Sequence, residues 1–399
     1  MAPRTALILL FAATLLIRTG YGGIMPVLPL YAAEHGLSPM LIALMTNAYL
    51  ASHAFLQGPM GHLSDRWGRR PMLLGGAALY ALVAALFLLD GGPWPFTLLR
   101  ALEGLAASAV VPVVRAAVVD LVAPEGRGRA FGALFAVETA GLVLGPLVGG
   151  WAHTAGGIQA PFLAGAGLSL LATLALLALP RGMRPVAPAE PAAESGPIRR
   201  GELQRILRSG AFWAAALPGI SMAYLTGLYT VIWSLFMQEV GATPWEINLS
   251  WGLYSLPVVL LMVPFGALAD RIGRPRMVLT GGLLTALITL AYGFFANPLP
   301  LLILCAVDGI ATSIFTPASQ AFIADVTPVS MRGRFLGLVG SASTVATIGA
   351  VTLLGALYGR VPASWIFGIG TLTLGAGTLL SVWLMTRRPT YALRQELED

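Results

Sequence analysis

Six charged side chains interrupt the long apolar stretches of this sequence, where a charge is costly and indicates function. They are Arg18, Arg100, Glu103, Arg115, Glu138 and Asp308. A carboxylate in such a place can gain and lose a proton, and a nearby arginine favours its charged form. We therefore expect the three acids to act in proton coupling, in the order Glu138, Asp308 and Glu103, with the three arginines as their partners.

Helical spacing predicts which of these charges meet. Arg100 and Glu103 are three residues apart and share one face of a helix. Arg115 and Glu138 lie at comparable depths on consecutive helices, given the rise of about 1.5 Å per residue, so they can pair. A static Arg115–Glu138 ion pair is the alternative to a coupling role for Glu138.

The composition is that of an integral membrane protein. Hydrophobic residues make up 57% of the 399 residues and charged residues only 11%, against about 25% charged in a soluble protein. All 24 basic residues are arginines, so the lysine of a GxxxxGK[ST] loop is missing and a P-loop ATP-driven pump is excluded. We expect no enzyme activity, no metal ion and no cofactor.

Apolar stretches of about 20 residues, the length that crosses a bilayer, occur about twelve times. The first six lie near 5–32, 41–60, 72–90, 95–122, 130–152 and 160–180, and the second six near 211–238, 247–266, 276–296, 298–324, 335–357 and 364–386. The prediction is an all-α membrane protein of twelve transmembrane helices in two pseudo-symmetric six-helix bundles. The bundles cover 1–180 and 210–388, with a cytoplasmic linker at 181–209, ending in a short helix, and a tail at 389–399.

Arginines gather in the linker and in alternate loops, as they do on the cytoplasmic side of membrane proteins. This distribution explains the basic charge without a nucleic-acid partner. An even number of spans then places both termini in the cytoplasm. We expect a multi-pass monomer in the lipid bilayer of a bacterial inner membrane.

The two halves repeat each other at a constant offset of 205 residues. The offset carries GHLSDRWGRR, which starts at Gly61, onto GALADRIGRPR, which starts at Gly266, and it carries Glu103 onto Asp308. Each half has six spans, so both enter the membrane in the same orientation. Such parallel repeats hold their substrate between the halves, near the middle of the membrane.

The two charged loops resemble the duplicated loop signature of the major facilitator superfamily. The resemblance implies that the loops latch the halves together on the cytoplasmic side, with Arg69 reaching Asp120 and two glycines for a close helix approach and a tight turn. It assigns this role to Gly61, Asp65, Arg66, Gly68, Arg69, Asp120, Asp270, Gly273 and Arg274. The alternative is that these charges only set the topology.

Three further motifs resemble motifs of that superfamily, and the first and third resemble those of its drug:proton antiporters, which have twelve helices. They are PVLPLY at Pro26–Tyr31, LLRALEGLAASA at Leu98–Ala109 and GALFAVETAGLVLGPLVGG at Gly132–Gly150. In the second motif the arginine, here Arg100, is associated with proton transfer, and Glu103 stands where glutamine is usual. The third resembles the antiporter motif, whose glycines and proline are Gly141, Gly145, Pro146, Gly149 and Gly150.

Gly141, Gly145 and Gly149 share one helix face, and small residues let helices approach closely. The 205-residue offset places Ala346, Ala350 and Val351 at the positions of Gly141, Gly145 and Pro146, and only Gly150 keeps a glycine equivalent, Gly355. We interpret the stripe as sealing a pathway and permitting exchange. Ordinary helix packing is the alternative.

Aromatic and methionine side chains in the seventh span predict an apolar cavity wall. Those that share roughly one helix face are Tyr224, Tyr229, Trp233 and Met237. Such a wall suits lipophilic or cationic compounds through dispersion and cation–π contacts. Lipid-facing or interhelical packing is an equal alternative.

The resemblance implies a proton-coupled antiporter that exports small amphipathic or drug-like molecules by alternating access of two bundles. Four alternatives stay open. These are efflux of sugars or other metabolites, flipping of lipid-linked molecules, uptake by symport, and a transporter-like receptor that moves nothing.

Overall fold

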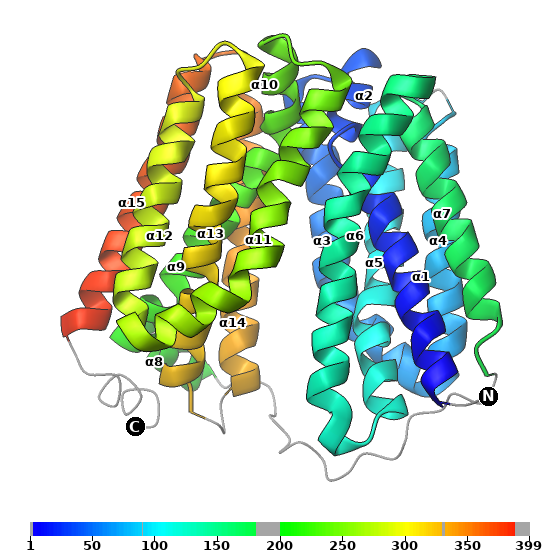
Figure 1. Cartoon of the computed structure of the whole chain (residues 1–399), viewed down its shortest axis with the longest axis horizontal. Coiled ribbons are helices and arrows are strands. Elements are labelled where there is room, and N and C mark those ends of the chain that lie inside the picture. The colour runs from blue at the N-terminus through cyan, green and yellow to red at the C-terminus, as the bar shows by residue number, and fades with distance from the viewer. Residues whose placement is uncertain (1–2, 90, 181–199, 329–331, 388–399) are drawn as a thin grey trace. The chain divides into compact units, whose positions relative to one another are not determined.

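The structure is a computed structural model that describes residues 3–89, 91–180, 200–328 and 332–387. The predicted tail and most of the predicted linker, 181–199, lie outside the described residues. The chain divides into two compact units (Figure 1). Unit 1 contains Met1–Pro188 and Thr230–Gly252, and unit 2 contains Ala189–Tyr229 and Leu253–Asp399.

Unit 1 is built from the first seven helices, a single 3-10 turn, a short later helix and the first turns of α11. These are α1 (Pro3–Ile24), α2 (Leu28–Glu34), α3 (Pro39–Trp67), α4 (Arg69–Leu86), α5 (Pro93–Leu121), η1 (Pro124–Gly126), α6 (Arg127–Gly156), α7 (Ala160–Leu177), α10 (Ser234–Glu239) and α11 (Pro244–Ile272). The predicted first span, 5–32, is two helices rather than one. Pro26 lacks the amide hydrogen that would continue α1, and Pro29 lies in the first turn of α2, where proline is favoured.

Unit 2 contains the rest of α11 and the remaining helices. These are α8 (Arg200–Arg208), α9 (Gly210–Leu228), α12 (Arg274–Tyr292), α13 (Pro298–Val326), α14 (Arg332–Leu357) and α15 (Ala363–Arg387). The predicted seventh span, 211–238, is α9 followed by a π-helical turn, η2 (Tyr229–Trp233), and α10. The short helix predicted at the end of the linker is α8.

The predicted all-helical membrane fold is confirmed. Eleven helices of the described chain are long and apolar enough to cross a membrane, so the chain is a multi-pass membrane protein. One predicted span, 72–90, is not among these eleven helices. It corresponds to α4, which has only 18 residues and begins with Arg69 and Arg70. These two arginines lower its mean hydropathy, although α4 packs on α5 and α7 like its neighbours.

The two units repeat the same helix packing. In unit 1, α1 packs on α6 and α7, and α4 packs on α5 and α7. In unit 2, α9 packs on α14 and α15, and α12 packs on α13 and α15. These pairs correspond one to one under the 205-residue offset, so each unit serves as an internal comparison for the other.

The turn between α3 and α4 depends on a glycine. Gly68 has a φ of 94°, and its repeat equivalent Gly273, between α11 and α12, has a φ of 102°. Side chains other than glycine rarely adopt this backbone conformation. Each glycine therefore allows one long helix to end and the next to begin without an intervening loop.

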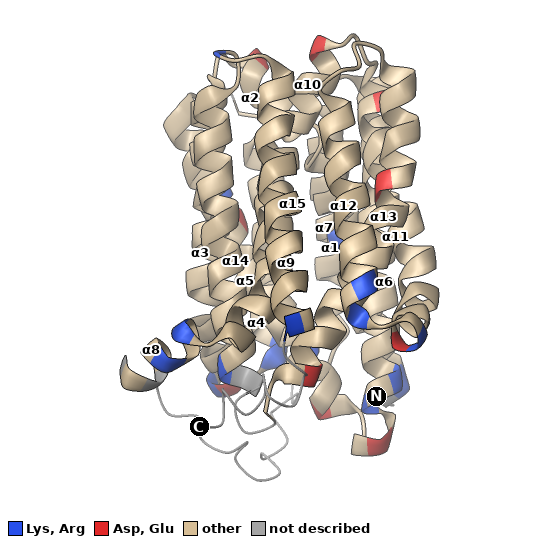
Figure 2. Ribbon diagram, turned by 90° about the vertical axis from the view of Figure 1, so that its left-hand side faces the viewer, with Lys and Arg blue, Asp and Glu red and all other residues tan. Residues whose placement is uncertain are grey.

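Charged residues lie mostly near the helix ends, and a few lie within the helices (Figure 2). The buried core of unit 1 contains many alanines among its larger side chains, including Ala13, Ala77, Ala106 and Ala117. Small residues let membrane helices approach closely. Against this background, the interior charges are the features that need a functional explanation.

Candidate functional site

The first charged loop is a compact ion-pair cluster centred on Arg69. Its Nε donates to Asp120 Oδ2 at 2.8 Å, so the predicted contact is present. Its Nη1 donates to Asp65 and, at 2.6 Å, to Ser64 Oγ. The Arg69 side chain is only 8% exposed, which reduces screening by solvent compared with a surface ion pair. The cluster thus joins the end of α3, the start of α4 and the end of α5.

Two of the predicted latch residues have other roles here. No described atom lies within 4 Å of the position that a Cβ on Gly61 would take. Within unit 1, Gly61 therefore makes no close helix approach, and its carbonyl accepts a hydrogen bond from Ser64 Oγ at 2.7 Å. The close approach expected of the latch stays a prediction. The Arg66 side chain is exposed.

Unit 2 holds a looser copy of the cluster. Arg274 Nη1 lies 2.8 Å from Asp270 Oδ1, and its Nε lies 2.7 Å from Asp325 Oδ2. Ala269 is the repeat equivalent of Ser64, so the hydroxyl partner is missing. The Arg274 side chain is 26% exposed, compared with 8% for Arg69. The first cluster is the more completely bonded of the two.

The glycine stripe of the antiporter motif packs α6 against α1. A Cβ on Gly145 would lie 2.7 Å from Gly22 Cα, and a Cβ on Gly149 would collide with the backbone of Gly23. These glycines pack closely against α1, and the pathway seal stays a prediction. They form a helix contact inside unit 1, because α1 presents its own glycines to them.

The remaining residues of the motif contact two helices. Pro146 lies beside Gly22, with its Cδ 3.5 Å from the position of a Cβ there. Gly150 faces α11 instead, where a Cβ would lie 2.7 Å from Asn248 Cβ. Gly141 lies directly against Arg18, whose Cβ occupies the space that a side chain at 141 would need. The first glycine of the stripe therefore positions Arg18.

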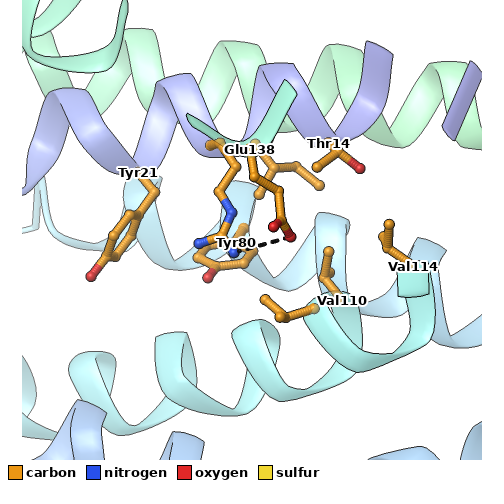
Figure 3. Close-up of a pocket in the computed structure, with 9 residues that line it drawn as sticks. Thr14, Tyr21, Tyr80, Val110, Val114 and Glu138 are labelled. Atoms are coloured by element: carbon orange, nitrogen blue, oxygen red, sulfur yellow. Dashed lines mark ion pairs between the residues drawn. The ribbon is translucent and has the colours of Figure 1, made fainter. Parts of the chain in front are cut away.

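Glu138 of α6 lines a small pocket of unit 1 (Figure 3), and two arginines lie close to its carboxylate. Its Oε1 is 3.5 Å from Arg18 Nη2, and its Oε2 is 3.6 Å from Arg115 Nη2. The predicted Arg115–Glu138 pair is present. Arg18 is a second partner that sequence reasoning did not pair with Glu138, although the facing Gly141 is its signal. Tyr21 and Tyr80 line the same pocket.

Glu103 has a buried partner of its own. Arg100 Nη1 donates to Glu103 Oε2, and both side chains are at most 6% exposed. The guanidinium carbon of Arg100 lies 4.4 Å from the centre of the Tyr49 ring, a cation–π contact. The charge of Glu103 is therefore matched by a fixed countercharge.

Asp308 of α13 lies among hydroxyl groups. It is 1% exposed, and its Oδ2 accepts hydrogen bonds from Tyr229 at 3.4 Å and Tyr292 at 3.3 Å. Its Oδ1 has no hydrogen-bond partner within the described chain. Cys305 is the repeat equivalent of Arg100, so the position that holds the countercharge in unit 1 holds a thiol in unit 2.

Asp308 thus differs from the other two candidate acids. Among the described residues, the ion pairs include Glu103 and Glu138 but not Asp308. Sequence reasoning missed Tyr292 and Cys305 at this site. The change from Arg100 to Cys305 under the repeat offset was the available signal.

The four residues of the predicted cavity wall have different surroundings. Trp233 is 4% and Met237 is 0% exposed, and Trp233 Nε1 donates to Ser250 Oγ at 2.8 Å. Tyr229 bonds to Asp308 instead, and Tyr224 is half-buried. The reason is the π-helical turn η2, in which the i→i+5 bonding widens the helix and breaks the four-residue spacing.

The comparisons with known proteins agree with this architecture. A family model described as Major Facilitator Superfamily matches residues 10–232 and again 219–399. Multidrug resistance protein 2 of Bacillus subtilis is 26% identical to the chain, and the match covers 98% of each sequence. Multidrug resistance protein MdtG of Citrobacter koseri is 28% identical over 78% of each.

A crystal structure of a D-xylose-proton symporter superposes on the chain with a TM-score of 0.75 at 16% identity, covering 98% of both chains. At this identity the likeness shows the shared fold. The first match of the family model covers the first half and continues through the linker to residue 232, and the second match covers most of the second half.

Proposed function

The chain belongs to the Major Facilitator Superfamily and is a transporter, and on this premise we propose that it exports small amphipathic, drug-like molecules in exchange for protons. Alternating access of the two six-helix bundles carries the exchange. The protein acts as a monomer in a bacterial inner membrane, with both termini in the cytoplasm and the charged loops forming the cytoplasmic latch.

The observation that carries the proposal is the position of Asp308. A buried carboxylate without a cation is costly while it is charged. Binding a proton removes that cost because the carboxyl group becomes neutral. Contact with water lowers the cost of the charged form, and contact with a substrate also alters it, so either contact changes how readily the proton is held. Glu103 and Glu138 have arginine partners that stabilise their charged forms, so they are less suited to exchange a proton. Asp308 therefore takes the first place that the sequence alone gave to Glu138.

Tyr229 and Tyr292 supply the local groups that such an exchange needs. Their hydroxyls donate to Asp308 Oδ2, and Tyr229 is also 2.9 Å from Thr289 Oγ1. Tyr229 is the last residue of unit 2 before Thr230, which belongs to unit 1. A partner of the carboxyl group thus lies where the chain passes from one unit to the other.

Export, rather than uptake, is supported by the relatives. Those named above are multidrug resistance proteins from bacteria. The antiporter motif and its close α1–α6 contact are present as well. The D-xylose-proton symporter has the same fold, and a symporter moves its substrate in the same direction as the proton. The fold alone therefore does not decide between export and uptake, and the direction of transport has to be tested.

Substrate-dependent proton release tests the proposal on the purified protein. The probe is N-phenyl-1-naphthylamine, an uncharged amphipathic fluorophore, added to the protein in a weakly buffered detergent solution with a pH indicator. Wild type is expected to release protons as the probe binds, and Asp308→Asn is expected to bind the probe without releasing them. Glu239→Gln, the same kind of change at an exposed acid outside the site, is the control and keeps the release. Equal release from Asp308→Asn and wild type would reject the role of Asp308.

A further inference from the structure

The two units carry pockets at equivalent positions. The unit 1 pocket is lined by residues that include Thr14, Arg18 and Glu138. Their repeat equivalents, Gly219, Ala223 and Ser343, line a pocket of unit 2. The duplicated fold therefore builds the same pocket twice, with different chemistry in each copy.

The difference between the copies is charge. Arg18 and Glu138 of unit 1 are replaced by Ala223 and Ser343 in unit 2, and Arg115, which pairs with Glu138, is replaced by Gln320. The helices around both pockets pack in the same pairs. The fold thus forms this pocket without any of the three charges, so packing does not explain why unit 1 has them.

The charges of the unit 1 pocket do not cancel. Two guanidinium groups share one carboxylate, at 3.5 and 3.6 Å. The nearby Arg100 is matched by Glu103 and contributes no net charge. The Arg18–Glu138–Arg115 cluster therefore carries one excess positive charge. The Arg115 side chain is 56% exposed and that of Arg18 is 23% exposed, so both are accessible.

We infer that this cluster binds the anionic group of the exported molecule, an inference that rests on the proposed export function. A carboxylate, sulfonate or phosphonate would neutralise the excess charge, and guanidinium groups bind such anions through paired hydrogen bonds. Tyr21 and Val111, which line the same pocket and are half-buried, provide apolar contacts for the rest of the molecule. The substrate class is therefore an amphipathic acid, in contrast to the cationic compounds that the aromatic residues of the seventh span favoured.

Gly141 supports this site indirectly. Its missing side chain allows Arg18 to approach α6 one turn from Glu138, so it is a positioning residue for the cluster. The glycine stripe and the charged cluster are then parts of one arrangement, in which α1 is held against α6 with its arginine directed to the pocket.

The experiment exchanges the unit 1 charges for the side chains of unit 2. The variant is Arg18→Ala/Arg115→Gln/Glu138→Ser, and each new side chain already occupies the equivalent place in the same fold. The probes are N-phenyl-1-naphthylamine and 8-anilinonaphthalene-1-sulfonate, which share their ring system and differ by a sulfonate. Transport of each into inside-out proteoliposomes is driven by an imposed pH gradient, and Arg360→Gln, at an exposed position outside the cluster, is the control.

Loss of an ion-paired contact weakens binding about tenfold or more. The variant is therefore expected to transport the sulfonate at least tenfold less efficiently, in kcat/KM, while transport of the uncharged probe stays within about twofold. A second variant, Glu138→Gln, leaves both arginines unpaired and is expected to bind the sulfonate more tightly than wild type. If Glu138 has only a structural role, Glu138→Gln is expected to bind the sulfonate more weakly than wild type does.

The possible outcomes separate this inference from the proposed function. A variant that transports both probes as wild type does, or loses both equally while it remains folded, overturns the anion site. A wild type that moves only the uncharged probe overturns it too, but leaves proton-coupled export intact. A wild type that moves neither probe in response to the pH gradient rejects the export function on which the inference rests.

Discussion

Replacing Gly145 by alanine tests whether the antiporter glycines form the α1–α6 contact. The added Cβ would lie 2.7 Å from Gly22 Cα and 2.9 Å from Gly23 N, and real Cβ atoms essentially never approach other atoms within 3.0 Å. These neighbours are backbone atoms, so relief requires the two helices to move apart.

The expected size of the effect follows from this geometry. Overpacking of this kind costs about 1–3 kcal/mol, and the better helix propensity of alanine offsets about 1 kcal/mol of it. Gly145→Ala is therefore expected to lower the free energy of unfolding by up to about 2 kcal/mol. Gly132→Ala, on the same helix α6 with no described atom within 4 Å of its Cβ position, receives only the propensity gain and is the matched control.

A cysteine placed in unit 1 serves as the unfolding probe. In a Cys305→Ser background, Ser169→Cys puts the one thiol on α7 of unit 1 at a position that is 4% exposed, so a thiol-reactive fluorophore labels it only as unit 1 unfolds. The labelling temperature is expected to fall for Gly145→Ala and to stay equal or rise for Gly132→Ala. Equal labelling temperatures for the two variants would refute the packing role of the stripe.

Three further predictions follow from the same contacts. Asp65→Asn is expected to abolish transport while expression in the membrane stays intact, because Arg69 loses a charged partner; normal transport by the well-expressed variant would remove the latch role. Ser64→Ala gives unit 1 the residue that unit 2 has at 269, and thermal unfolding is expected to show a loss of about 1 kcal/mol of stability. An unchanged stability would mean that the hydrogen bonds of the Ser64 hydroxyl do not stabilise the cluster. Cys305→Arg gives Asp308 the countercharge that Glu103 has, and transport under a pH gradient should then lose its proton dependence; a variant that folds and stays fully coupled would contradict the assignment.

The sequence predicted well those features that depend on local spacing and on the repeat. The Arg69–Asp120 contact belongs to this group, because the Gly68 turn places Arg69 at the start of a helix that must pass the end of the next one. The Arg100–Glu103 pair was predictable because three residues bring two side chains onto one helix face. Under the 205-residue offset the Arg69–Asp120 contact recurs as Arg274–Asp325, whereas Arg100 and Glu103 are replaced by Cys305 and Asp308. The offset therefore also allows each contact to be compared between the two units.

Other features depend on which helices meet, and spacing does not show this. Arg18 reaches Glu138 because Gly141 faces it across the α1–α6 contact, and the glycines alone did not reveal their partner helix. Tyr229 and Tyr292 come to Asp308 from different helices. The π-helical turn at Tyr229–Trp233 is not visible in the hydrophobic pattern, so the seventh span was read with a regular period that it does not keep.

The central claim is that Asp308 couples proton movement to export, and transport by reconstituted protein tests it most directly. Inside-out proteoliposomes with wild type or Asp308→Asn are given a pH gradient, and accumulation of N-phenyl-1-naphthylamine is measured beside its exchange at equal pH on both sides. Wild type is expected to accumulate the probe against its gradient, and Asp308→Asn is expected to exchange the probe but to accumulate none. Accumulation by Asp308→Asn at the wild-type level would contradict the claim.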